Sequence, residues 1–213
     1  MRVELLHHTP LDVCAHAIRT CWQSFDKSDG GGERDRALID RVGNKYRHSS
    51  TLEHLVYTFY ISGISRALLQ ELARHRMASL SVKSTRYTLK ELKESELFGE
   101  RDFQAASKFI VLTGNEDVDE ASIAALNRLS SLLKKGIGND MAKYALPESY
   151  KTELTWTVNA RSLQNFLSLR SSKSALWEIR KLSLKIYEAL PQEHSYLFEE
   201  FMNPDYNTKA EEK

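Results

Sequence analysis

The sequence lacks the features that mark membrane-spanning and secreted proteins. No apolar run approaches the roughly 20 residues that span a bilayer, and the first ten residues, MRVELLHHTP, lack the apolar core of a signal peptide. Cysteine is scarce, and helical spacing would hold Cys14 and Cys21 about 10 Å apart along the helix axis, too far for a disulfide. We therefore expect a cytoplasmic protein with reduced thiols that does not associate with a membrane.

The sequence also lacks the common motifs for phosphate and metal binding. It contains neither the dinucleotide pattern G-x-G-x-x-G nor the P-loop pattern G-x-x-x-x-G-K-[ST]. The consecutive glycines at 30–32 are followed by Glu-Arg-Asp, whose carboxylates would repel a phosphate, so we interpret them as a flexible loop. No Cys/His spacing indicates structural zinc, and no metal is expected. A bound nucleotide would be held mainly by side chains and helix ends.

What the sequence does contain is typical of a globular domain. Its 213 residues are 41% hydrophobic and 28% charged, which is enough to bury a sizeable core. The periodicity indicates an α+β fold with a central, mostly antiparallel sheet flanked by helices. We expect a single domain over 1–204 and a polar tail over 205–213. Strands are predicted at 2–9, 55–63 and 151–159, a loop ending in a strand at 77–87, helices at 11–25, 36–47, 65–76, 160–171 and 175–190, and shorter helical pieces near 101–112 and 117–135.

One stretch departs from the even mixture of charges elsewhere. The net charge is +1, so a field over the whole protein that attracts nucleic acid is not expected. Residues 72–90 nevertheless contain no Asp or Glu and carry six basic side chains: Arg74, His75, Arg76, Lys83, Arg86 and Lys90. An anion would therefore be met by this local cluster.

Two of these arginines have both a structural and a functional interpretation. A helix over 65–76 would place Arg74 and Arg76 in its last turn, where cations interact well with the helix dipole. Glu71 would then lie at ion-pair spacing from Arg74. The lack of acids further along the stretch favours ligands as counter-charges instead. Because they are two residues apart on a helix, the two arginines would point to roughly opposite sides and could bind two different anions.

A second pattern places an arginine where a leucine would be expected. Four residues at i, i+3, i+4 and i+7 share the apolar face of one helix: Leu163, Phe166, Leu167 and Arg170. A buried guanidinium needs an anionic partner, which is either a protein carboxylate or a ligand. A separate polar stripe could hydrogen-bond a heteroaromatic ligand or simply face solvent; it contains Arg161, Asn165 and Ser168.

The segment HSSTLEH, residues 48–54, also has two interpretations. His48, Glu53 and His54 could hold a metal ion, but such spacings are common by chance and no further spaced ligand is evident. Ser50 and Glu53 have the spacing of a capping box at the start of a helix. We favour the capping box.

Three blocks of the sequence resemble the flavin-dependent thymidylate synthases. RHRMASLSVKS is similar to the family signature of Arg-His-Arg, seven residues and Ser, and TRY continues it. RHSSTLEH and WTVNARSLQNFLSLR resemble the family's other blocks and stand in the family's order. The resemblance implies reductive methylation of dUMP to dTMP, with 5,10-methylenetetrahydrofolate as one-carbon donor and with NADPH supplying reducing equivalents through FAD. It also implies a homotetramer whose active sites are shared between chains.

The resemblance implies roles for individual residues as well. Contacts to FAD are implied for His48, Ser50, Glu53, Arg74, His75, Arg76, Asn159, Arg161 and Asn165. Contacts to dUMP are implied for Glu71, Arg74, Ser84, Thr85, Arg86, Lys143 and Arg170. Of the two catalytic residues, Arg170 would stabilise negative charge on the pyrimidine, and Ser84 would position the substrate rather than attack it as a nucleophile.

The chain departs from the family pattern at several of its positions. Lys143 stands where the family usually has Arg, and Glu71 stands where it has a Gln that touches the nucleotide. Ser81 and Val82 replace the Asn and Glu of many members. A carboxylate that the family places near the substrate is therefore missing from this chain.

Two other classes of function remain open. An RNA-binding module would use residues 72–90 as a basic loop and would bind RNA with steep salt dependence, although Tyr87 is the one aromatic residue beside that loop. A structural subunit would pair Arg170 with an acid across an oligomer interface. The enzyme hypothesis differs from both, because it predicts a yellow protein that forms dTMP only with dUMP, the folate and NADPH together.

Overall fold

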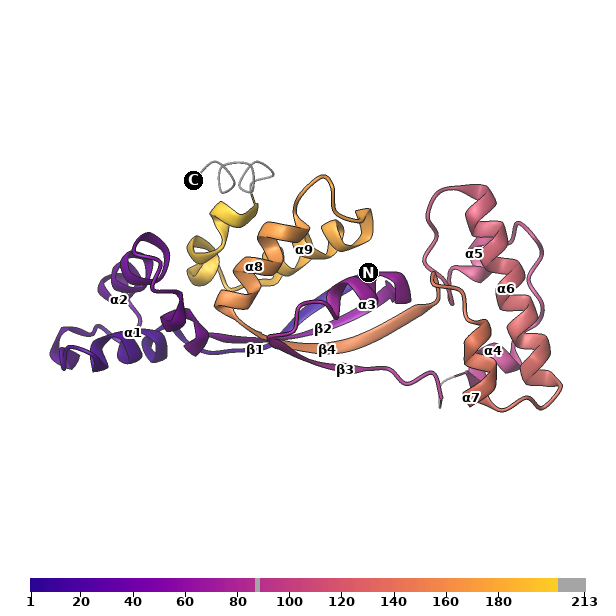
Figure 1. The fold of residues 1–213 in the computed structure, drawn as a ribbon, viewed down its shortest axis with the longest axis horizontal. Coiled ribbons are helices and arrows are strands. Elements are labelled where there is room, and N and C mark those ends of the chain that lie inside the picture. Colours follow the sequence, from indigo (N-terminus) through magenta and orange to yellow (C-terminus); the bar gives the residue numbers. More distant parts are fainter. Residues whose placement is uncertain (87–88, 203–213) are drawn as a thin grey trace. The chain divides into compact units, whose positions relative to one another are not determined.

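The fold is built on one four-stranded sheet. A computed structural model of the chain describes residues 1–86 and 89–202 (Figure 1). Four strands pair as an antiparallel sheet in the order β1-β2-β4-β3. Their bounds are β1 (Arg2–His8), β2 (Val56–Ser65), β3 (Ala78–Val82) and β4 (Lys151–Asn159). The sheet and its flanking helices confirm the predicted α+β class.

Helices occupy much of the remaining described chain. The α-helices are α1 (Leu11–Thr20), α2 (Glu33–Ile39), α3 (Arg66–Leu72), α4 (Lys90–Glu94), α5 (Phe103–Ala106), α6 (Glu116–Lys134), α7 (Asn139–Ala142), α8 (Ala160–Arg170) and α9 (Trp177–Ala189). A π-helical segment η2 (Asp40–Lys45) follows α2, and the 3₁₀ segments are η1 (Phe25–Lys27), η3 (Ser49–His54), η4 (Lys143–Ala145), η5 (Gln192–Leu197) and η6 (Glu199–Met202). Within 1–86 and 89–202, no helix is long and apolar enough to cross a bilayer. The predicted tail, 205–213, lies outside the described residues.

Contacts within the chain group it into two compact units. The first unit comprises Met1–Ile61, Glu71–Leu80 and Thr155–Lys213, and the second comprises Ser62–Gln70 and Ser81–Leu154. The expectation of a single domain over 1–204 stays a prediction.

An aromatic core stabilises the first unit. Alternate residues of β4 are buried, as the two-residue period of a strand requires. Trp156 of β4 packs on Phe166 of α8 with 5.1 Å between ring centroids, and Phe59 of β2 lies 6.2 Å from the Trp156 ring. Phe166 also meets the ring of His75 edge-on at 5.0 Å. The hydrophobic core therefore extends to the Arg-His-Arg motif that the sequence singled out.

The second unit has a helical core of its own. Helix α6 packs against α4, α5 and α7, and Leu126 and Leu129 of α6 are buried together with Leu92 of α4. Ser130 adds a hydrogen bond from its Oγ to the carbonyl of Leu92 at 3.2 Å. The helix predicted near 117–135 is confirmed as α6, whereas the piece predicted near 101–112 is reduced to the four residues of α5.

Helix α3 ends earlier than the sequence predicted. It stops at Leu72, so the two arginines of the Arg-His-Arg motif follow the helix and do not lie in its last turn. A continuing helix would direct the His75 amide to the Glu71 carbonyl. That amide instead bonds to the Leu72 carbonyl at 3.0 Å, and Arg170 Nη2 donates to the Glu71 carbonyl at 3.3 Å. The prediction that the arginines emerge from two faces of a helix is therefore wrong.

The order of strand and loop after the motif is also the reverse of the prediction. Strand β3 comes first and the loop follows it. The amide of Lys83, just after β3, still donates to the Glu153 carbonyl of β4 at 2.9 Å. Pairing with β4 supplies the hydrogen bonds that make this polar segment a strand, and the local sequence does not signal such pairing. Ser81 and Val82, which depart from the family pattern, are exposed on β3.

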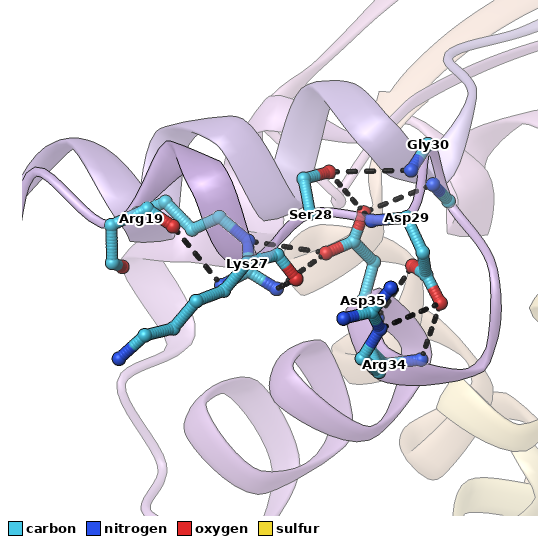
Figure 2. Close-up of polar contacts among 9 residues, drawn as sticks. Arg19, Lys27, Ser28, Asp29, Gly30, Arg34 and Asp35 are labelled. Atoms are coloured by element: carbon cyan, nitrogen blue, oxygen red, sulfur yellow. Dashed lines mark hydrogen bonds and ion pairs between the residues drawn. The ribbon is translucent and has the colours of Figure 1, made fainter.

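The glycine-rich loop is ordered around one buried carboxylate (Figure 2). Asp35 accepts hydrogen bonds from the Gly31 amide at 3.0 Å, from Ser28 Oγ at 2.6 Å and from Arg19 Nη2 at 2.7 Å. Gly31 has a φ of +88°, which glycine adopts without strain. Asp29 accepts from two backbone amides in the first turn of α2. The interpretation of the glycines as a flexible loop is wrong, because these bonds hold the backbone in place.

Both cysteines are free thiols, as predicted. Cys14 is buried in α1, and its Sγ donates to the Thr51 carbonyl at 3.3 Å. Burial raises the pKa of the Cys14 thiol to about 12. This thiol is therefore protonated at neutral pH and does not act as a nucleophile.

Candidate active site

A cavity of about 700 Å³ opens in the first unit, between η3, the turn after α3 and α8. Its size is typical of sites for small molecules and cofactors. The lining residues are Glu53, Arg74, His75, Arg76, Met77, Asn159, Arg161, Ser162, Asn165, Leu169 and Arg170. Because four of them are arginines, the cavity favours a ligand that carries negative charge.

The structure brings together most of the residues that the resemblance assigned to FAD. All of them except His48 and Ser50 line the cavity, and so does Arg170. His48 and Ser50 are exposed at the start of η3. Glu71 contacts Arg170 without lining the cavity. The remaining residues assigned to dUMP belong to the second unit: Ser84, Thr85, Arg86 and Lys143.

Arg170 makes three hydrogen bonds within the first unit. Its Nη1 donates to Glu71 Oε2 at 2.8 Å, its Nη2 donates to the Glu71 carbonyl at 3.3 Å, and its Nε donates to His75 Nε2 at 3.0 Å. The Arg170 side chain is 15% exposed and that of Glu71 is 32% exposed. Of the two partners that the sequence left open, the structure shows the protein carboxylate. A guanidinium has five N–H donors, so Arg170 can also bind a ligand.

His75 is uncharged at neutral pH. Burial, followed by the charges of Arg170 and Arg74, lowers the pKa of His75 to about 4 against the opposing effect of Glu71. A neutral ring whose Nε2 accepts a hydrogen bond from Arg170 carries its proton on Nδ1. His75 therefore orients the Arg170 guanidinium without adding positive charge beside it.

An ion pair joins η3 to α8 at the cavity. Glu53 Oε1 lies 2.7 Å from Arg161 Nη1. The predicted capping box is wrong, because η3 is a 3₁₀ segment whose N-cap residue is His48 rather than Ser50, and His48 makes no side-chain cap hydrogen bond. Among residues 1–86 and 89–202, no group of His, Cys, Asp and Glu side chains is arranged to hold a metal ion. Glu53 instead orients Arg161 toward the cavity.

The first turn of α8 is fixed by its own cap. Asn159 Oδ1 accepts a hydrogen bond from the Ser162 amide at 2.9 Å, which satisfies one of the free amides at the helix start. Arg161 and Asn165 are four residues apart, so they share one face of the helix. Both are exposed and line the cavity. The polar stripe predicted from the sequence is therefore part of the site.

Sequence reasoning missed three lining residues, Met77, Ser162 and Leu169. Met77 is 74% exposed and Leu169 is 48% exposed, which is unusual for large apolar side chains. The sequence carried a signal for Met77 and Leu169. Met77 directly follows the Arg-His-Arg motif, and Leu169 is a leucine off the apolar face of α8. These two side chains add an apolar surface to a cavity that is otherwise rich in arginine.

Two of the predicted dUMP contacts in the second unit, Arg86 and Lys143, have partners there. Arg86 Nε and Nη2 donate to the two carboxylate oxygens of Asp140 at 2.6 and 3.1 Å. Asn139 Nδ2 donates to the Arg86 carbonyl at 2.7 Å. Lys143 Nζ lies 5.8 Å from the centroid of the Tyr144 ring. Arg86 is thus held in a bidentate geometry beside α7.

Carboxylates from outside the basic stretch pair with several of its cations. The N···O distances are 3.7 Å for Arg74–Glu71, 3.3 Å for Lys83–Glu153, 2.6 Å for Arg86–Asp140 and 3.6 Å for Lys90–Glu94. The expectation that ligands supply the counter-charges is corrected for these four side chains. Arg76, in contrast, is an exposed arginine at the cavity.

Comparisons with known proteins agree with the resemblance. The family model described as thymidylate synthase complementing protein matches residues 4–194. The flavin-dependent thymidylate synthase of Wolinella succinogenes is 72% identical over 93% of this chain and 97% of its own length, and that of Campylobacter jejuni strain RM1221 is 67% identical over 96% and 99%. A crystal structure of thymidylate synthase X from Helicobacter pylori with FAD and dUMP has a TM-score of 0.91 and 57% identity, and covers 95% of this chain and 100% of that one. The chain therefore belongs to the flavin-dependent thymidylate synthase family.

Proposed function

We propose that this protein catalyses the reductive methylation of dUMP to dTMP in the de novo synthesis of thymidylate. One observation carries the proposal. The cavity of the first unit joins the Arg-His-Arg motif to the Asn159–Arg170 block, and four arginines line it together. Such a lining suits nucleotides, whose phosphates bind guanidinium groups and whose rings need amide and apolar contacts. The relatives named as flavin-dependent thymidylate synthases support the same activity.

FAD is the cofactor that the cavity lining suits. Arg76 and Arg161 would bind its diphosphate, and the side-chain amide of Asn165 would hydrogen-bond the edge of a ring. Met77 and Leu169 would pack against an apolar ring face. The volume of about 700 Å³ and the mixed lining support this fit. When bound, FAD supplies the hydride that completes the new methyl group.

Arg170 is the residue that we propose acts on the substrate. Negative charge develops on the pyrimidine as its C5 becomes nucleophilic, and a guanidinium that is only 15% exposed stabilises such charge more strongly than one in water. His75 and Glu71 hold Arg170 in position for this task. Ser84 would position dUMP through its hydroxyl. The further contacts to dUMP are proposed for Arg74, Thr85, Arg86 and Lys143, while Glu71, which the resemblance also assigned to dUMP, would act through Arg170 and Arg74.

We further propose that NADPH and 5,10-methylenetetrahydrofolate are co-substrates and that the protein works in the cytoplasm as a homotetramer with shared active sites. The family resemblance supports these points. Several large apolar side chains are exposed on the chain, including Trp22 (84%), Tyr144 (83%) and Met141 (70%). Where such exposed side chains form a contiguous apolar patch, they mark a surface on which subunits associate. Light scattering of the purified protein would measure the number of chains in the assembly.

A reconstitution experiment tests the proposed activity. The purified protein should be yellow, or become yellow with added FAD, and should form dTMP only when dUMP, NADPH and the methylene folate are all present. Omission of each component in turn serves as the control. Rescue of a thymidine-requiring host by the gene tests the same activity in cells. A colourless protein that cannot be reconstituted with FAD would overturn the proposal.

The structure weakens the case for RNA binding by residues 72–90. Lys83, Arg86 and Lys90 are paired with protein carboxylates, and each such acid repels a nucleic-acid phosphate. Part of the stretch is strand β3 rather than an extended basic loop. The alternative of a structural subunit is weakened as well, because Arg170 pairs with an acid of its own chain.

A further inference from the structure

Glu71 joins two of the cavity's arginines. Its Oε2 accepts from Arg170 Nη1 at 2.8 Å, and its Oε1 lies 3.7 Å from Arg74 Nη1. Glu71 itself does not line the cavity, so it would act on a ligand through these arginines. We propose that Glu71 is a positioning residue that sets the affinity for dUMP: it orients Arg170 and Arg74, while its charge opposes binding of the anionic phosphate. This inference rests on the proposed function.

The positioning effect follows from the geometry of Arg170. A free arginine side chain has many rotamers, and ordering them on binding lowers the affinity. The carboxylate of Glu71 accepts a hydrogen bond from one N–H of Arg170, its backbone carbonyl accepts from a second, and His75 Nε2 accepts from a third. Five donors less these three leaves one N–H on each terminal nitrogen. A ligand can therefore bind Arg170 without displacing Glu71.

The opposing effect follows from the charge of Glu71. With the pyrimidine of dUMP at Arg170, a phosphate bound to Arg74 would share that guanidinium with a carboxylate of the same sign. At a separation of about 6 Å and an effective dielectric constant of about 20, this repulsion is large, and salt and partial exposure reduce it. We expect the charge of Glu71 to weaken dUMP binding by about fivefold to tenfold.

A neutral substitution separates the two effects. Glu71→Gln keeps an oxygen that accepts from Arg170 Nη1, and it leaves the backbone carbonyl unchanged. Glutamine is also the residue of the family pattern at this position. The variant should therefore keep Arg170 oriented while it removes the repulsion. Its dissociation constant for dUMP should be about five to ten times lower than that of the wild type.

The experiment is calorimetric titration of the FAD-loaded protein with dUMP at low and at high salt. The gain in affinity of Glu71→Gln should shrink as salt is raised. Deoxyuridine, which lacks the phosphate, should bind the variant and the wild type with affinities within twofold of each other. Equal or weaker binding of dUMP by Glu71→Gln, or an equal gain for deoxyuridine, would overturn the inference.

Two further variants keep the test decisive. Glu120→Gln removes the same charge from an Arg–Glu pair in the second unit, where Glu120 Oε1 accepts from Arg101 Nε at 2.7 Å, and its dUMP affinity should match the wild type. If Glu71→Gln does not fold, Glu71→Met replaces it as a neutral side chain of similar length. Because it also removes the side-chain acceptor for Arg170, the quantity to compare is the ratio of dUMP affinity to deoxyuridine affinity, which should be higher in Glu71→Met than in the wild type. A wild type that binds no dUMP refutes the proposed function itself, whereas a wild type that binds dUMP as tightly as the variant refutes only the role of Glu71.

Discussion

Two arginine–carboxylate pairs of the first unit have the same chemistry and different surroundings. Arg19 and Asp35 are 6% and 0% exposed, and Arg19 also donates to the backbone carbonyls of Ser24 and Lys27 at 3.4 and 3.1 Å. Arg170 and Glu71 are 15% and 32% exposed at the cavity. The two N···O distances are alike, 2.7 and 2.8 Å.

The two pairs differ in whether the arginine keeps N–H donors that a ligand can reach. Around Asp35, hydrogen bonds from Ser28, the Gly31 amide and Arg19 outweigh the effect of burial and lower the carboxyl pKa to about 2. The Arg19–Asp35 pair is buried and bonded within the protein, and its role is structural because it orders the loop between α1 and α2. Arg170 keeps N–H donors at a cavity wall, so its pair can take part in binding. Burial and completeness of bonding, rather than residue type, separate a structural pair from a functional one.

The largest expected effect concerns Arg170. We expect Arg170→Ala to lower kcat for dTMP formation by about 10²–10³-fold, because the charge that develops on the pyrimidine loses its guanidinium partner. The variant should remain folded and assembled, since its pair is partly exposed. Turnover assays, thermal unfolding and light scattering check these points. A loss of assembly with dUMP binding unchanged would instead place Arg170 among interface residues.

The next effect concerns the buried pair. Asp35→Asn should lower the free energy of unfolding by about 3 kcal/mol, because Arg19 would be left buried without a full counter-charge. Glu71→Gln is the matched variant at the partly exposed pair and should cost less than about 1 kcal/mol. Urea denaturation of both variants measures the difference. Equal losses would show that the two pairs contribute alike to the fold.

Acid should act on the two sites in different pH ranges. His75 has a folded pKa of about 4, below its usual 6.5, so the unfolded state binds the proton first and stability falls between about pH 6.5 and 4. His75 alone changes the free energy of unfolding by at most about 1.4 kcal/mol per pH unit. Asp35 has a folded pKa of about 2, below 3.8, so its contribution is present above about pH 3.8 and is lost as the pH falls toward 2.

Single substitutions at these residues should separate the two pH ranges. His75→Gln should flatten the dependence of unfolding free energy on pH between 6.5 and 4, and Asp35→Asn should flatten it below about 3.8. His194, whose pKa burial also lowers to about 4, contributes equally to the wild type and both variants. Urea denaturation across the pH series is the measurement. An unchanged slope in His75→Gln would contradict the assigned pKa.

The smallest effects concern the glycines that surround the buried pair. Gly30 and Gly31 both have positive φ, +68° and +88°, but a Cβ would meet no atom within 4 Å at Gly30 and would lie 3.3 Å from the Asp12 amide nitrogen at Gly31. We expect Gly30→Ala to cost about 1 kcal/mol and Gly31→Ala about 2 kcal/mol. Thermal unfolding of the two variants would test this order, and a larger loss at Gly30 would contradict it.

Regular segments with a strong pattern were predictable. Strand β4 matches the expected 151–159, and α8 matches the expected helix within one residue. Alternation and the 3.6-residue period are local properties, and both segments bury their apolar face as the pattern requires. The arginine on the apolar face of α8 was visible for the same reason, because its place in the pattern belongs to an apolar residue.

Segments that depend on distant partners were not predictable. Helix α3 ends at Leu72, where Arg170 donates to the backbone carbonyl of Glu71, the acceptor that a continuing helix would need. Arg170 is 99 positions from Glu71 in the sequence. Strand β3 forms because β4 pairs with it, and the Asp35 carboxylate that orders the glycine loop is itself paired with Arg19, 16 positions earlier in the sequence. In each case the competing hydrogen bond comes from elsewhere in the chain, where local propensity carries no information.

The amino-acid sequence by itself determined the α+β class, the family and the residue blocks that meet at the cavity. It could do so because periodicity and motif spacing are properties of neighbouring residues. Only the tertiary structure decided which charges pair. It showed that Glu71, already at ion-pair spacing from Arg74 in the sequence, also pairs with Arg170, that other cations of the basic stretch pair with acids outside it, and that Asp35 is buried. Ion pairs depend on distance and burial in space, and folding sets both.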